Sequence, residues 1–235
     1  MKTLNNIEEE KLASMKEMMD NIAHQWRQPL SQINSIVGVI DNKLFEMGIE
    51  DAFITQKLEE IEKLTKYMSD TIDDFKGYFG ENNQKELFSV AEVIDDALDV
   101  LEHTFKKYSI RVESTIRSNI SFDGYRNELK QIIIILLNNA KDILVTRNIH
   151  NPCINVSLQE RGEDLIISVC DNGGGMTKSV RAKLFEPYFT TKHKSQGTGL
   201  GLYMSRKIID ERFHGVLDVE NKDDGVCFYI TLPKG

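Results

Sequence analysis

The chain has 235 residues, of which 40% are hydrophobic and 28% charged, a composition typical of a soluble globular protein. Its formal net charge of −8 argues against binding to nucleic acid or to an anionic membrane surface, because like charges repel. The longest dense apolar run, residues 132–137, is far shorter than the roughly 20 residues that cross a bilayer. We therefore expect a cytoplasmic chain without a membrane segment, either complete or cut from a longer, membrane-bound parent.

The three cysteines, Cys153, Cys170 and Cys227, include no C-x-x-C pair. Their odd number does not indicate a disulfide framework, so we expect all three to be reduced.

Residues 1–80 have the pattern of two long amphipathic helices, with a break at residues 47–51. Apolar residues recur at steps of three and four, as on one face of a helix. The first stripe contains Ile22, Trp26, Leu30, Ile33, Val37, Ile40 and Leu44, and the second contains Ile54, Leu58, Ile61, Leu64, Met68, Ile72 and Phe75. The two helices predict an antiparallel hairpin.

A single hairpin cannot bury both of its stripes well. We therefore expect a homodimer in which residues 10–75 of two chains form a four-helix bundle, with Trp26 in its core. The alternative is that the hairpin packs against the C-terminal domain of its own chain.

The polar segment 81–85 is interpreted as a linker, so the predicted domains are residues 1–80 and 85–235. Strand-like runs follow at residues 86–90, 109–116, 153–159, 164–170, 216–220 and 226–232, and helical patterns at 91–107, 125–147 and 199–213. This alternation predicts an α/β sandwich, a sheet with helices on one face, so the whole chain belongs to the α+β class.

Two short motifs in this second domain contain polar residues that could bind a ligand. Asn139 and Asp142 share one face of the predicted helix 125–147, and an amide oxygen is a hard ligand that suits Mg²⁺. Asp171 ends an apolar strand, where its carboxylate could accept a hydrogen bond from an exocyclic amine. The glycines at 173–175 let the backbone approach a ligand closely.

Two further motifs follow at residues 185–192 and 197–202. In the first, aromatic residues around a proline could anchor a flexible loop that carries Lys192. In the second, glycines precede a helix and would expose backbone N–H groups to an anion. Each of the four motifs, taken alone, is also compatible with a plain helix edge, turn or packing contact.

In this order and spacing, the four motifs resemble the N, G1, F and G2 boxes of the ATPase domain shared by histidine kinases, type II topoisomerases, mismatch-repair ATPases and the large heat-shock chaperone. The resemblance covers roughly residues 85–235 and implies ATP and Mg²⁺ as cofactors, held under a lid at residues 190–196. By this analogy Asn139 ligates Mg²⁺ and Asp171 reads adenine. The other implied nucleotide-site residues are Asp142, Gly173, Gly175, Lys192, Gly197, Thr198, Gly199, Leu200 and Gly201.

Ile135 occupies the position one helical turn before Asn139, where topoisomerase-type ATPases carry a glutamate base. An aliphatic side chain cannot activate water. This difference argues against hydrolysis by the domain itself and for transfer to another nucleophile.

The segment 21–30 resembles the H box of the dimerising hairpin of histidine kinases and implies His24 as the phosphoacceptor. Neutral imidazole is a competent nucleophile near pH 7. Gln25 stands where the family usually has an acidic residue and cannot take up a proton, so phosphorylation should be slower or use another base. Gln28 lies one turn after His24, and we expect it to help dephosphorylate a partner's aspartate. Pro29 should kink or loosen the helix.

The leading interpretation is a sensor-type histidine kinase core that passes phosphate from ATP through His24 to an aspartate of a response regulator. Two alternatives stay open: an ATP-binding signalling scaffold with weak or no kinase activity, and an ATPase of the topoisomerase or chaperone kind.

Overall fold

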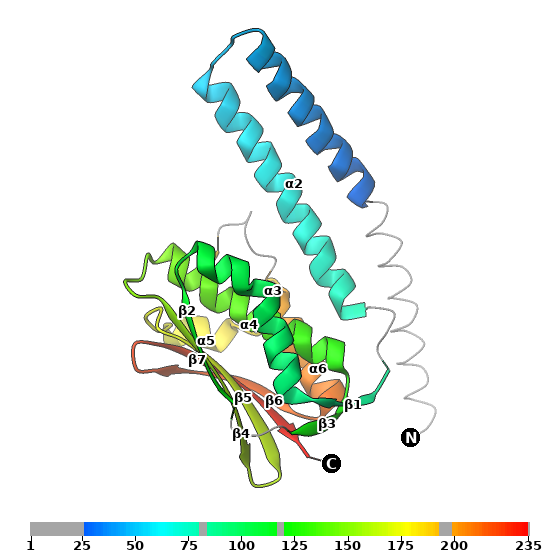
Figure 1. Cartoon of the computed structure of the whole chain (residues 1–235), viewed down its shortest axis with the longest axis vertical. Coiled ribbons are helices and arrows are strands. Elements are labelled where there is room, and N and C mark those ends of the chain that lie inside the picture. Colours follow the sequence, from blue (N-terminus) through cyan, green and yellow to red (C-terminus); the bar gives the residue numbers. More distant parts are fainter. Residues whose placement is uncertain (1–25, 80–83, 117–119, 193–198, 235) are drawn as a thin grey trace. The chain divides into compact units, whose positions relative to one another are not determined.

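The structure, a computed structural model, describes residues 26–79, 84–116, 120–192 and 199–234 (Figure 1). The chain divides near residue 81 into two compact units, which are described separately below. In the described residues, no helix combines the length and the apolar character needed to cross a membrane.

The first unit is the predicted hairpin. Residues 26–46 are helical, and α2 spans Ala52–Phe79. Between them Gly48 has a φ of 63°, a left-handed conformation that glycine adopts at little cost. Asp51 then begins α2, because its Oδ1 accepts hydrogen bonds from the backbone N–H groups of Phe53 (2.8 Å) and Ile54 (3.1 Å). The first helix is continuous across Pro29, which therefore does not end it.

The inner face of the hairpin is narrow. Leu30 and Val37 are buried, whereas Trp26, Ile33 and Ile40 on the neighbouring line of the same helix are 51%, 40% and 43% exposed. A single chain thus buries only part of the apolar stripe that the sequence shows.

The second unit contains a five-stranded and a two-stranded sheet. Its strands are β1 (Glu86–Ser89), β2 (Arg111–Ile116), β3 (Ser121–Gly124), β4 (Cys153–Arg161), β5 (Asp164–Asp171), β6 (Val216–Lys222) and β7 (Gly225–Pro233). Its helices are α3 (Val90–Lys107), α4 (Arg126–Thr146), α5 (Lys178–Lys183) and α6 (Gly201–Phe213). The large sheet has the order β2-β4-β5-β7-β6, in which only β2 and β4 are parallel neighbours, and β1 pairs with β3.

Helices α3, α4 and α6 cover one face of the large sheet (Figure 1). Alternate residues of the three central strands point to this face and are almost fully buried, among them Val156, Ile167 and Ile230. The predicted α/β sandwich with helices on one face is confirmed. Two short elements, β3 and α5, were not predicted from the sequence.

One expectation about the cysteines is wrong. Cys170 of β5 and Cys227 of β7 are directly opposite each other in the antiparallel ladder and form a disulfide, with their Cα atoms 4.0 Å apart. Cys153 is free. The number of cysteines could not show this, because the strand register brings together residues 57 positions apart.

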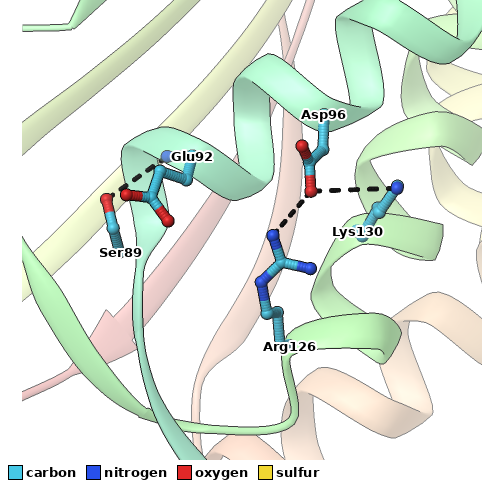
Figure 2. A network of polar contacts seen from close by, with 5 residues as sticks. All are labelled: Ser89, Glu92, Asp96, Arg126 and Lys130. Atoms are coloured by element: carbon cyan, nitrogen blue, oxygen red, sulfur yellow. Dashed lines mark hydrogen bonds and ion pairs between the residues drawn. The ribbon is translucent and has the colours of Figure 1, made fainter.

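Helix α4 is fixed to both of its helical neighbours. Asp96 of α3 accepts a hydrogen bond from Arg126 at 2.6 Å, and Lys130 lies 3.9 Å from the same oxygen (Figure 2). Figure 2 also shows Ser89, whose hydroxyl caps α3 by accepting the N–H of Glu92.

On the other side of α4, the buried carboxylate of Glu128 lies 2.7 Å from the guanidinium of Arg212 in α6. Arg212 also stacks over the ring of Tyr125, 5.0 Å from its centroid. These contacts hold α4 in place, and its C-terminal half forms one wall of the site described next.

Candidate functional site

Asp171 is the last residue of β5 and points to the helix-covered face, in line with the buried Val169. Its Oδ1 accepts a hydrogen bond of 2.7 Å from the backbone N–H of Gly173. Burial raises the pKa of the Asp171 carboxyl above its ordinary value, while backbone N–H groups of Gly173 and Val226 and the charge of Arg147 act in the opposite direction. A half-buried carboxylate held in this way can accept a hydrogen bond from a ligand amine.

The glycines after Asp171 are required by the backbone. A Cβ atom at Gly173 would lie 2.5 Å from Cγ2 of Ile143 and 2.8 Å from Oδ1 of Asp171. Gly174 and Gly175 have φ values of 82° and 53°, which other residues adopt only with strain. The loop therefore turns tightly and packs directly on α4.

The contact between Gly173 and Ile143 joins the first two sequence motifs. Asn139 is one turn before Ile143 and Arg147 one turn after it, so all three lie on the same face of the α4 segment. Asn139 is half-buried on this face. The neighbouring Asp142 carboxylate is 3.0 Å from the ammonium group of Lys141.

The third and fourth motifs also meet. Gly199 has a φ of 67°, and a Cβ atom there would collide with the backbone of Tyr188 and Phe189. Phe185 lies under the guanidinium of Arg206 in α6, 4.8 Å from the ring centroid. The segment at 185–189 is thus packed on the start of α6.

The N-terminus of α6 suits an anion. Its N-cap is Leu200, which has no polar side chain, and no acidic residue occupies its first turn from Gly201. The aligned peptide dipoles of a helix place a partial positive charge at this end.

Some predicted site residues lie outside the described part of the chain: His24, Gln25, Gly197 and Thr198. Gln28 is exposed on the first helix of the hairpin unit. Lys192 is half-buried at the end of the described segment 120–192.

Three residues around the loop were not predicted from the sequence. Arg147 donates to the glycine carbonyls, Asn221 of β6 bonds both backbone polar groups of Met176, and Gly225 leaves room for the Asp171 carbonyl. Only Arg147 carried a usable signal, since it follows Asn139 by two helical turns on the same face.

Comparisons with known proteins agree with this geometry. Residues 124–235 match the family described as histidine kinase-, DNA gyrase B- and HSP90-like ATPase. The chain is 29% identical to the two-component sensor PprA of Pseudomonas aeruginosa, over 95% of this chain and 25% of PprA. It is 28% identical to sporulation kinase B of Bacillus subtilis, over 97% of this chain and 51% of that kinase. It therefore spans a quarter to a half of these two relatives.

Among solved structures, the catalytic domain of histidine kinase ThkA superposes with a TM-score of 0.58 at 28% identity, covering 64% of this chain and 96% of that domain. A complex of ThkA with the response regulator protein TrrA has the same TM-score at 24% identity, covering 97% of this chain and 64% of that one, and supports the fold alone.

The described residues fit a purine nucleotide with its phosphates. A carboxylate stands at one end of the site beside a glycine loop that has no room for a Cβ atom at Gly173. A helix N-terminus and a half-buried amide on α4 offer groups for phosphate oxygens and a hard cation.

Proposed function

We propose that this chain, which has the sequence and fold of a sensor histidine kinase catalytic core, transfers the γ-phosphoryl group of ATP to His24 and then to an aspartate of a response regulator. The observation that carries the proposal is the junction of Asp171, the glycine loop and the Asn139 face of α4 in one site.

In this site the Asp171 carboxylate accepts a hydrogen bond from the exocyclic amine of adenine. The glycine loop allows the base to approach the backbone, and the N-terminus of α6 faces the phosphates. Asn139 would hold Mg²⁺ through its amide oxygen, and the ion would offset negative charge on the phosphates. Asp142, Lys192, Gly197 and Thr198 complete the proposed site.

The transfer itself is an in-line displacement. Nε2 of neutral His24 forms a bond to the γ-phosphorus, the bond to the β–γ bridging oxygen breaks, and ADP leaves with the electron pair. In the second step an aspartate oxygen of the response regulator attacks the same phosphorus, and the N–P bond breaks. Ile135 supplies no base for water on the α4 side, which favours transfer over hydrolysis.

Two glutamines next to the phosphoacceptor have proposed roles. Gln25 orients the imidazole through a hydrogen bond to its side-chain oxygen but takes up no proton. Gln28, which is exposed, positions a water molecule against the aspartyl-phosphate of the partner.

We further propose that the chain acts as a homodimer. Trp26, Ile33 and Ile40 are seven residues apart along one line of the first helix, and all three are 40–51% exposed in the single chain. This spacing is the seam of a helical bundle. A second hairpin would bury the line and form the four-helix bundle.

The proposed partner is the receiver domain of a response regulator. The name of the relative PprA, a two-component sensor, supports this proposal, and the similar kinase ThkA was solved in complex with a response regulator protein. Because the chain spans only a quarter to a half of the sensor and kinase relatives, we propose that it works as the cytoplasmic catalytic part of a longer sensor.

Incubation with γ-labelled ATP tests this function, with His24→Gln as the matched variant. We expect acid-labile, alkali-stable label on the wild-type protein and a loss of at least about 100-fold in His24→Gln, because the amide is not a nucleophile. Nucleotide binding should be unchanged in the variant.

Other outcomes identify other functions. Release of free phosphate without protein label would indicate an ATPase, and nucleotide binding with neither product would indicate a scaffold. Label on a residue other than His24 would overturn the proposal.

A further inference from the structure

One arginine nitrogen contacts three consecutive backbone carbonyls of the glycine loop. Nη1 of Arg147 lies 2.6 Å from the oxygen of Gly173, 2.5 Å from that of Gly174 and 3.0 Å from that of Gly175. Hydrogen bonds from a charged donor are about twice as strong as those between neutral groups.

The three carbonyls can converge only because of the unusual backbone of the loop. Gly174 and Gly175 both have left-handed φ values, which turn successive peptides to the same side. Three carbonyl dipoles aimed at one point repel each other, and the positive charge at that point offsets the repulsion. Without the cation, this loop conformation loses its main electrostatic support.

The N–H groups of the same loop are held from the opposite side. Gly173 donates to Asp171, and Gly174 donates to the backbone oxygen of Asp224 at 2.5 Å. The loop is therefore fixed on both of its polar edges, by the strand ends on one and by Arg147 on the other.

Arg147 is itself held by a rigid element. It is the C-cap of α4, and its backbone N–H bonds the oxygen of Ile143 at 3.0 Å. A cation is favoured at this end of a helix, where the dipole is negative. The ion pairs of Glu128 and Asp96 fix α4 to its neighbours, so the helix that carries the Arg147 guanidinium is held in place.

We propose that Arg147 is a positioning residue of the nucleotide site, which holds residues 173–175 in the conformation that receives the base. This inference rests on the proposed nucleotide-binding function and adds a residue to it. Arg147 also links the α4 face that carries Asn139 to the loop after Asp171. The distance between the groups proposed to bind the base and those proposed to bind the phosphates is thereby fixed. In addition, its charge favours the ionised form of Asp171.

The test uses the whole 235-residue chain and the variants Arg147→Met, Arg147→Lys and Arg147→Gln. Arg161→Met is the matched control, because Arg161 is an exposed arginine opposite Asp164, at the end of the β4–β5 ladder that is far from Asp171 and the loop. For each variant, the Kd of Mg²⁺-ADP and the KM and kcat of His24 labelling are measured, with circular dichroism as the check of folding.

We expect Arg147→Met to raise the Kd and the KM about tenfold or more, as removal of charge-assisted hydrogen bonds does, with kcat within about twofold at saturating ATP. Arg147→Lys should restore binding in part, since an ammonium keeps the charge but not the planar geometry. Arg147→Gln should bind several times more weakly than wild type, and Arg161→Met should match wild type.

The inference is overturned if Arg147→Met, or Arg147→Gln should the methionine variant not fold, binds nucleotide like wild type. Equal weakening in Arg161→Met would also overturn it, because the effect would then not depend on contacts with the loop. A wild-type chain that binds no nucleotide would instead refute the proposed function.

Discussion

At the scale of single residues, Asp171 meets two opposing requirements. Its carboxylate has to be ionised to accept a hydrogen bond from an adenine amine, yet burial raises its pKa above the ordinary 3.8. The N–H groups of Gly173 and Val226 and the charge of Arg147 offset only part of this effect. The site therefore keeps a carboxylate that is unfavourable for folding, as functional sites often do.

The sign of the pH effect follows from the raised pKa. Between pH 3.8 and the higher pKa of the folded state, the folded chain keeps a proton that the unfolded chain has released. The contribution of Asp171 to the unfolding free energy is thus largest at acidic pH and falls as pH rises through this window.

Replacement of Asp171 by Asn should remove this part of the pH dependence. Urea unfolding of both proteins at about pH 4 and about pH 7 checks it, and the variant should gain stability relative to wild type between the two values. The affinity for ADP should fall about tenfold or more, since an amide has one accepting oxygen where the carboxylate has two, one for the Gly173 N–H and one for the adenine amine. Identical pH dependence in the two proteins would contradict the assigned cause.

At the scale of elements, the first helix of the hairpin and α4 differ in how much of their apolar surface is buried. Helix α4 is held on both sides by ion pairs with α3 and α6, and its inner residues are fully buried. The first helix of the hairpin buries Leu30 and Val37 but leaves Ile33 and Ile40 exposed. An apolar line of this kind is typical of a surface that a second chain covers.

The variant Ile40→Glu should therefore weaken the proposed dimer. Placing a charge in the seam leaves it desolvated without a partner, which we expect to raise the dimer dissociation constant about 100-fold. Sedimentation or light scattering over a concentration series measures this. Val39→Glu is the control, because Val39 is more exposed (68%) and lies about 100° further round the helix. Equal effects of the two variants would count against the assigned seam.

At the scale of the whole molecule, nucleotide binding and phosphoacceptance belong to different units in our proposal. The second unit contains every described residue of the nucleotide site except Lys192, which groups with the first unit although it follows residue 81 in the sequence. The similar domain of ThkA was solved as a separate chain, of which this chain covers 96%.

Residues 84–235 expressed alone should bind ADP within about threefold of the full chain, because the core and most of the site are local to this unit. This fragment should not become labelled by γ-labelled ATP. When a fragment of residues 1–83 is added, that second fragment should become labelled in trans. A labelled 84–235 fragment would show that the phosphoacceptor lies outside the hairpin.

Much of the fold was determined by local sequence pattern. Apolar steps of three and four predicted the hairpin helices, and helical patterns predicted α3, α4 and α6. Short strand-like runs predicted β1, β2, β4, β5, β6 and β7. The order of four motifs was enough to indicate a nucleotide site, since each motif is short and continuous in the chain.

Tertiary structure alone decided the contacts that join distant segments. Arg147 and its loop partners are 26–28 residues apart, and the bonded cysteines are 57 apart. No repeating sequence pattern marks pairs at such separations. Strand register and helix packing bring these residues together only when the sheet and its helical layer have formed.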